Sequence, residues 1–103
     1  EKIVYTELSK YPTVHRDLAL VVDKNVHYDE VEKIIRSANI QHLQQVHLFD
    51  MFESEKLGTE KKSLAINFTF MDKTKTLTDG ETDAMMNKLV AGFEKQLNAL
   101  IRK

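Results

Sequence analysis

The segment Lys62–Met71 has the most regular alternation of apolar and polar side chains in this sequence. Large apolar residues occupy every second position, and small or polar residues lie between them: Leu64, Ile66, Phe68 and Phe70 against Ser63, Ala65, Asn67 and Thr69. Successive side chains of a β-strand point to opposite faces of a sheet. The pattern therefore predicts a strand with one face in a core and one small, polar face that looks outward.

Three further strands are predicted around this one. Their ranges are Asp17–Asp23, Gln44–Glu53 and Ala99–Lys103. A polar loop at Ser54–Glu60, with Gly58 at a turn, predicts that the second and third strands form a hairpin. The residues before the first strand, Glu1–Thr13, are expected to be an extended lead-in, because the only proline, Pro12, biases the preceding residue toward extended backbone.

Two helices are predicted from apolar residues with a helical spacing. The first begins at His27 or Tyr28 and stops at Asn39, and its apolar stripe is Val31, Ile34, Ile35 and Ala38. The second follows a capping box at Thr78–Glu81 and ends near Asn98. Its apolar stripe is Met86, Leu89, Val90, Phe93 and Leu97.

The resulting order β-α-β-β-α-β predicts an α+β fold of the ferredoxin-like type. In this fold two helices cover one face of a four-stranded antiparallel sheet, and the other face is open. A chain of 103 residues is long enough for one domain with its own core, and it has no cysteine for a disulfide or thiolate metal site. We expect residues 1–103 to be a single domain, and the start at Glu1 rather than Met suggests a piece of a longer protein.

The run Val46–Phe52 is the densest apolar and aromatic stretch, and it contains one acid, Asp50. Asp is depleted from strands, where Phe and Val are enriched. Strict alternation predicts that Phe49 and Met51 anchor the strand in the core, while Asp50 and Phe52 point to the open face. The same alternation puts the two apolar residues Val46 and Leu48 on the face of Asp50 and Phe52.

The sequence offers little for catalysis. The three glycines are far apart, so no glycine-rich phosphate loop is present. The four histidines, His15, His27, His42 and His47, do not have the spacing of metal ligands. Ser63 has no evident His or Asp partner for nucleophilic catalysis. We therefore expect that this domain alone is not an enzyme and holds no metal or cofactor.

RNA binding on the open face is a second possibility. Phe52 would stack on a base, and the Asp50 carboxylate would accept hydrogen bonds from N1–H and N2–H₂ of guanine. Ser63 would add a hydroxyl, and Ala65, like Ala19, would let a base approach. Positive side chains would contact phosphates; the candidates are Arg16, Lys56, Lys61 and Lys62. The net charge of −1 leaves only a few specific contacts to supply affinity.

Two other readings of the same residues remain open. Phe52 packs under the lead-in segment and Asp50 bonds to a turn or a lysine, in which case neither residue is a binding site. Alternatively, the partly apolar open face contacts another protein subunit, as in a regulatory or protein-contact domain without RNA binding. The spacing of the residues does not choose between these readings.

Four motifs in order resemble the ferredoxin-fold anticodon-binding domain family. They are Tyr11-Pro12 followed by Arg16–Asp23, then Val46–Asp50, Lys61–Ala65 and Thr76–Asp79. Such a domain closes the β subunit of bacterial phenylalanyl-tRNA synthetase, and the organellar single-chain synthetase carries a similar one. Two features depart from the family pattern: the last turn has no glycine, and Phe52 replaces a tyrosine.

The resemblance implies a tRNA-binding module that recognises the anticodon of phenylalanine tRNA, whose first base is guanine. By motif position, Asp50 would read the guanine, Phe52 would stack and Ser63 would assist. Aminoacylation, with ATP and magnesium, would take place elsewhere in a class II ligase. The implied partners are the synthetase α subunit and the rest of the β subunit, in the cytoplasm and without a membrane.

Overall fold

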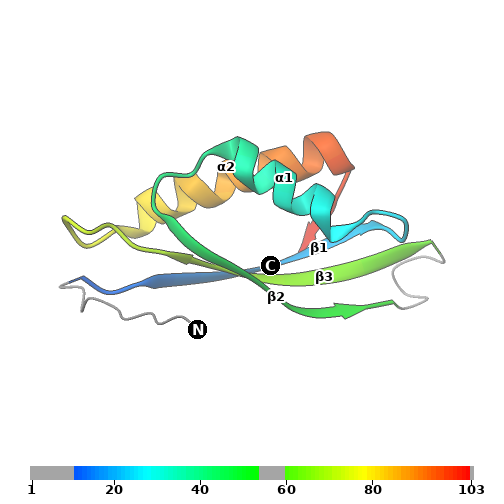
Figure 1. The fold of residues 1–103 in the computed structure, drawn as a ribbon, viewed down its shortest axis with the longest axis horizontal. Coiled ribbons are helices and arrows are strands. Elements are labelled where there is room, and N and C mark those ends of the chain that lie inside the picture. The colour runs from blue at the N-terminus through cyan, green and yellow to red at the C-terminus, as the bar shows by residue number, and fades with distance from the viewer. Residues whose placement is uncertain (1–10, 54–59, 103) are drawn as a thin grey trace, which may run out of the picture.

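The protein is a four-stranded antiparallel sheet with two helices packed across one face (Figure 1). The structure, a computed structural model, describes residues 11–53 and 60–102. The strand order is β2-β3-β1-β4. The elements are β1 (Val14–Asp23), α1 (Tyr28–Ala38), β2 (Leu43–Phe52), β3 (Lys61–Phe70), α2 (Asp79–Leu97) and β4 (Leu100–Arg102). The predicted ferredoxin-like fold is confirmed, including the pairing of β2 with β3.

The first strand is longer than predicted. β1 begins at Val14 rather than Asp17, and it pairs with β3 along its whole length, from Val14 opposite Phe70 to Asp23 opposite Lys61. The sequence did not show this extension because three polar residues, His15, Arg16 and Asp17, separate Val14 from the apolar residues of the strand. Most of the predicted lead-in and of the loop Ser54–Glu60 lies outside the described residues.

Both helices have the predicted ends. Thr78 caps α2: its Oγ1 accepts from the backbone N–H of Glu81 at 3.1 Å, and the Glu81 carboxylate accepts from the Thr78 N–H at 2.9 Å. Asn39 and Asn98 follow the helices in left-handed conformation, with φ of 52° and 56°. Asparagine adopts this conformation more readily than most residues. Asn98 therefore makes the turn into β4 that lacks a glycine.

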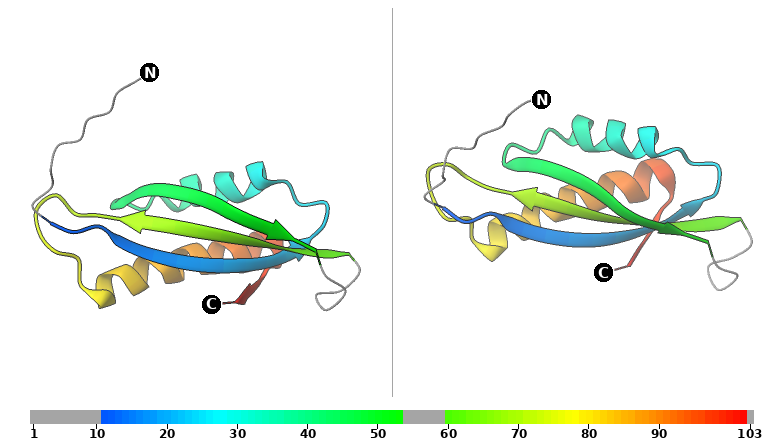
Figure 2. Two further views of the ribbon diagram at one scale, coloured as in Figure 1. Left: turned by 90° about the horizontal axis from the view of Figure 1, so that it is seen from below. Right: turned by 60° about the horizontal axis from the view of Figure 1, so that its bottom comes forward.

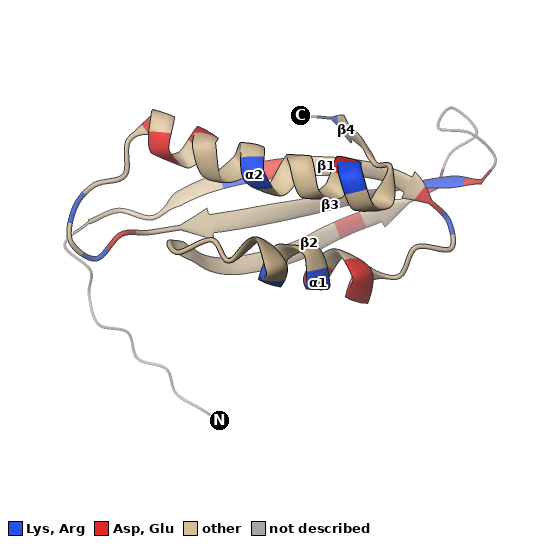
Figure 3. Cartoon of the chain, turned by 90° about the horizontal axis from the view of Figure 1, so that it is seen from above, with Lys and Arg blue, Asp and Glu red and all other residues tan. Residues whose placement is uncertain are grey.

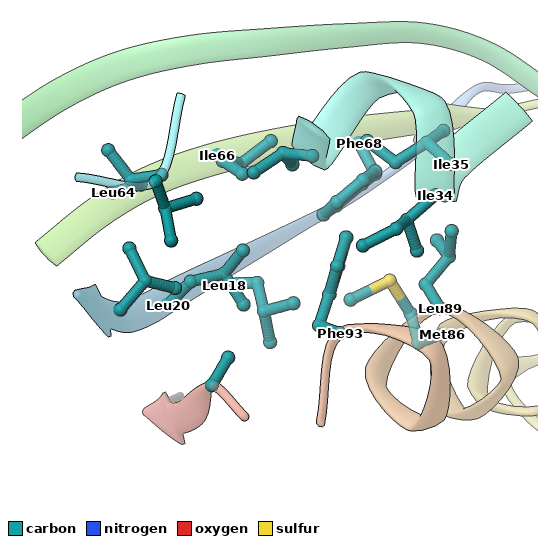
Figure 4. Close-up of a cluster of buried hydrophobic side chains, with 14 of the residues drawn as sticks. Leu18, Leu20, Ile34, Ile35, Leu64, Ile66, Phe68, Met86, Leu89 and Phe93 are labelled. Atoms are coloured by element: carbon teal, nitrogen blue, oxygen red, sulfur yellow. The ribbon is translucent and has the colours of Figure 1, made fainter. Parts of the chain in front are cut away.

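The core lies between the helices and the upper face of the sheet (Figure 4). Leu64, Ile66 and Phe68 of β3 are almost completely buried, as their alternation predicted. The main contributors from the other elements are Leu18, Leu20, Val31, Ile34, Ile35, Met86, Leu89 and Phe93. Burial of a large apolar side chain contributes about 1.5–3 kcal/mol, so this layer fixes which face of each strand is left for function.

Polar side chains connect the segment after β3 to the residue before β2. The buried side chain of Asp72 accepts hydrogen bonds from the backbone N–H and the hydroxyl of Thr74, at 2.8 and 2.7 Å. Nε2 of His42 lies 3.5 Å from the other carboxylate oxygen. The backbone and hydroxyl hydrogen bonds from Thr74, with smaller attraction from His42 and Lys75, lower the pKa of the Asp72 carboxyl.

We expect Asp72→Asn to destabilise the chain at pH 7 and to lose this effect in acid. Because the pKa of Asp72 is lower in the folded state, its ionised form adds stability above the unfolded pKa, and this is lost as the pH falls through the folded pKa. Urea unfolding of both proteins from pH 7 down to pH 3 measures the difference. A difference that does not change with pH would show that the charge of Asp72 contributes nothing.

Candidate functional site

Neither α1 nor α2 covers the lower face of the sheet, and Figure 2 shows this face turned toward the viewer. Residues that pair across antiparallel strands point to the same face, so the register defines rows of neighbours on this open face. The first row is Phe52, Ser63, Val21 and Leu100; the second is Asp50, Ala65, Ala19 and Arg102. The third is His47, Asn67 and Asp17, and the fourth is Gln45, Thr69 and His15.

A β-bulge at Phe49 changes the faces predicted for β2. Leu48 pairs with Ile66 and Asp50 with Ala65, so Phe49 is an extra residue between two regular pairs. Val46 and Leu48 pack on the core, and the prediction that they share the face of Asp50 is wrong. Strict alternation fails here because it counts Phe49 as a regular strand residue.

The ring of Phe49 belongs to the open face, so its prediction as a core anchor is also wrong. The residue is 51% exposed, and its ring stacks on His47 with centroids 6.5 Å apart and an interplanar angle of 20°. Met51 pairs with Leu64 and so points to the helix side, but it is 56% exposed and anchors little. Asp50 and Phe52 do point to the open face, as predicted, and Phe52 is 47% exposed.

A hollow of about 360 Å³ lies in the middle of the open face. Two exposed aromatic rings bound it on the β2 side, and its floor is made by small residues of β1 and β3. The lining residues are Asp17, Leu18, Ala19, Phe49, Phe52, Ser63, Ala65 and Arg102. Ser63 is only 3% exposed, because it lies between Phe52 and Val21 in its row. The hollow has an apolar floor and aromatic edge, which suit a flat ring.

The carboxylate of Asp50 lies next to this hollow, opposite Ala65. Its Oδ1 accepts a hydrogen bond from the backbone N–H of Met51 at 2.9 Å, directly after the bulge. Among the described residues its Oδ2 has no hydrogen-bond partner, and each carboxylate oxygen can accept more than one hydrogen bond. The bulge therefore holds an ionisable acceptor in a fixed position on an exposed face.

Two of the predicted phosphate contacts lie on the other side of the sheet. Arg16 pairs with Phe68 on the helix side, and its guanidinium is 3.5 Å from the Asp79 carboxylate at the start of α2. Lys62 pairs with Val22, a core residue, so it also belongs to that side. The structure thus brings Asp50, Phe52, Ser63 and Ala65 together, and it does not bring Arg16 or Lys62 to them.

Arg102 is a lining residue that the sequence reasoning missed. It pairs with Ala19 from the edge strand β4, which puts its guanidinium on the open face beside the hollow. The alternation of Leu100, Ile101 and Arg102 gave a signal, since Ile101 packs against the core. That signal depends on the pairing with β1, which the sequence did not define.

Two ion pairs lie at the end of the sheet where β1 and β2 stop and β3 begins. Lys61 lies 2.6 Å from the Asp23 carboxylate and Lys24 lies 3.3 Å from Glu53, and Figure 3 shows basic and acidic segments side by side at that end. Within residues 11–53 and 60–102, no group of three His, Asp or Glu side chains could hold a metal ion. In the same ranges no helix is long and apolar enough to cross a membrane.

Comparison with known proteins gives the family. The model of the ferredoxin-fold anticodon binding domain family matches residues 9–102. The chain is 46% identical over 101 residues to the phenylalanine–tRNA ligase beta subunit of Bacteroides thetaiotaomicron and 41% identical over 102 residues to that of Listeria monocytogenes. The protein of the same name from Streptococcus pneumoniae is 38% identical over 100 residues.

These alignments cover almost all of this chain but little of the relatives. They span 98%, 99% and 97% of the chain, and only 12%, 13% and 12% of the three relatives. The family match extends from before β1 to the end of β4, so it includes every element that forms the open face. The chain therefore belongs to the ferredoxin-fold anticodon binding domain family.

Proposed function

We propose that the open face binds the anticodon of phenylalanine tRNA, with guanine in the hollow bounded by Phe49 and Phe52. The observation that carries this proposal is the set of two half-exposed rings beside a carboxylate, on the sheet face that α1 and α2 leave uncovered. Single-stranded bases that are splayed out of a loop stack on such aromatic side chains. A contribution of about 1–3 kcal/mol per stacked base is usual.

The choice of guanine comes from Asp50. An ionised carboxylate only accepts hydrogen bonds, and the Watson–Crick edge of guanine offers two neighbouring donors, N1–H and N2–H₂. Adenine has an unprotonated N1 at the same place and would meet the carboxylate with a lone pair. Ser63 lines the hollow next to Ala65 but is only 3% exposed, so its hydroxyl would meet a base only at the floor of the hollow.

Arg102 supplies the positive charge that the hollow needs. Arginine binds phosphate through several N–H donors in a fixed geometry, and Arg102 lies at the edge of the hollow opposite the rings. The chain as a whole has 15 Lys and Arg against 16 Asp and Glu. The affinity for the rest of the tRNA would therefore come from other parts of a synthetase.

The complete protein would be a phenylalanine–tRNA ligase in which this domain contributes specificity and not chemistry. The α subunit and the remainder of the β subunit would form the catalytic site and hold most of the tRNA. That enzyme would use ATP and magnesium, and within residues 11–53 and 60–102 no group of three His, Asp or Glu side chains could hold the magnesium ion. No step of the proposal passes through either group.

Replacing the two rings tests the proposal. We expect Phe49→Leu and Phe52→Leu in the complete synthetase each to lower kcat/KM for tRNA by about tenfold, because each removes one stacking surface. The matched control is Met51→Leu, which changes an equally exposed residue between them that points to the other side of the sheet. Aminoacylation kinetics measure the effect, and tRNA-independent activation of phenylalanine shows that the catalytic site is intact.

If kcat/KM for tRNA is the same in Phe49→Leu and Phe52→Leu as in the control Met51→Leu, the proposal is contradicted. If the ring variants instead weakened the assembly of the enzyme and left tRNA kinetics unchanged, the open face would be a subunit contact. The exposed Leu100, at the edge of the same face, would then be part of that subunit contact.

A further inference from the structure

A chain of hydrogen bonds crosses the open face just beyond the hollow, and the proposed function does not use it. Nδ2 of Asn67 donates to Oδ1 of Asp17 at 2.7 Å, and Oγ1 of Thr69 donates to Oδ1 of Asn67 at 3.3 Å. Nδ1 of His15 lies 3.0 Å from the same Thr69 hydroxyl. These residues come from two neighbouring rows of the β1–β3 pair.

Chemistry fixes the direction of this chain. The Asp17 carboxylate only accepts, so the amide nitrogen of Asn67, not its oxygen, must face Asp17. The Asn67 oxygen then faces Thr69, whose single hydroxyl proton is used on it. The hydroxyl must therefore accept from Nδ1–H of His15. Each partner fixes the next, and Asn67 is held in one of its two amide orientations.

Asn67 keeps one donor and one acceptor in that orientation. An amide has two N–H donors and an oxygen with two lone pairs. The hydrogen bonds to Asp17 and from Thr69 use one donor and one lone pair. The side chain is half-buried, and it is one row from Ala65 in the floor of the hollow. Two residues of a strand span about 6.6–6.8 Å, so a nucleotide joined to the one in the hollow can reach it.

An aromatic surface continues from the hollow to this row. His47 lies opposite Asn67 and stacks on Phe49, which itself bounds the hollow. A second base on the ring of His47 would thus have Asn67 beside its edge. Asparagine pairs in a bidentate way with N6–H and N7 of adenine, whereas guanine offers two acceptors, O6 and N7, at the same edge.

We propose that Asn67 reads the N6–H and N7 edge of an adenine that follows the guanine in the bound anticodon, and that Asp17 and Thr69 position its amide. This inference rests on the proposed function, because it assigns the second base on the same face.

A double-mutant cycle on the complete synthetase, which combines a change at Asn67 with a change in the base, tests the role of Asn67. The two tRNAs carry either adenosine or 7-deazaadenosine at this position; the second lacks only the N7 acceptor. We expect the deaza change to lower kcat/KM about tenfold in the wild-type enzyme and to have no effect in Asn67→Leu. A residue with a merely structural role would leave the cost of the deaza change the same in both enzymes.

Two further variants test the positioning role. Thr69→Val removes the donor that orients the amide, so it should lower the preference for adenosine over 7-deazaadenosine severalfold. Thr69→Ser keeps the hydroxyl and should restore this preference. An equal cost of the deaza change in wild-type and Asn67→Leu would overturn the inference. Unaltered activation of phenylalanine and an unaltered melting temperature show that each variant is folded.

The proposed function has a separate readout in the same experiment. A tRNA with adenine in place of guanine at the first anticodon position reports on the hollow. If the wild-type enzyme does not distinguish guanine from adenine there, the proposed guanine site fails whatever the result at Asn67. If that preference is intact in Asn67→Leu and only the deaza cycle shows no coupling, the Asn67 inference alone is overturned.

Discussion

Deletion of Asn67 is expected to unfold the chain, whereas deletion of Phe49 in the neighbouring strand is expected to leave it folded. A one-residue slip in a strand moves its side chains to the opposite face. Without Asn67, either Leu64 and Ile66 or Phe68 and Phe70 must leave the core, and all four are almost fully buried. The loss of each such pair costs at least about 4 kcal/mol, out of a typical total of 5–15 kcal/mol.

The deletion of Phe49 has the opposite expectation because of the bulge. Phe49 is the extra residue between the pairs Leu48–Ile66 and Asp50–Ala65. Its removal joins these pairs in regular alternation, with Leu48 still toward the core and Asp50 still toward the open face. Urea unfolding followed by circular dichroism measures both variants. A folded deletion of Asn67, or an unfolded deletion of Phe49, would contradict the register described here.

These two deletions also show what the sequence could predict. The alternation in β3 defined the buried face correctly, since four large apolar residues at every second position admit only one orientation against a helical layer. The caps at Thr78 and Asn98 marked the ends of α2 because the requirements of helix ends are local. For these elements the local pattern and the tertiary structure agree.

The candidate site was predicted only in part, because it depends on pairing between distant strands. The bulge at Phe49 leaves no mark in β2 alone; it is defined by where Leu48 and Asp50 meet β3. Arg102 reaches the hollow only because β4 pairs with Ala19. Asp50 and Phe52 were assigned to the correct face, since both follow the bulge and are separated by one residue. Arg16 was placed near them by its charge, but its position in β1 turns it to the helices.

Asp50→Asn in the complete synthetase is expected to remove most of the preference for guanine at the first anticodon position. The asparagine keeps the size of the side chain and an oxygen that can accept from the Met51 N–H. It replaces the second acceptor with an N–H₂ donor, which opposes a donor of guanine and has no such conflict with N1 of adenine. Hydrogen bonds to a charged group contribute about 1.5–3 kcal/mol, so kcat/KM for guanine tRNA should fall about 10- to 100-fold.

The control for charge is Asp83→Asn, which removes the same charge from an exposed position on α2 in the helical layer. We expect this variant to keep the wild-type ratio of kcat/KM between guanine and adenine tRNAs. A nonspecific effect of charge would be the same in both variants and would change kcat/KM for both tRNAs by the same factor. A specific reader changes the ratio, and only in Asp50→Asn. If Asp50→Asn keeps the full preference for guanine, the carboxylate beside the bulge does not read the base, whatever else the open face binds.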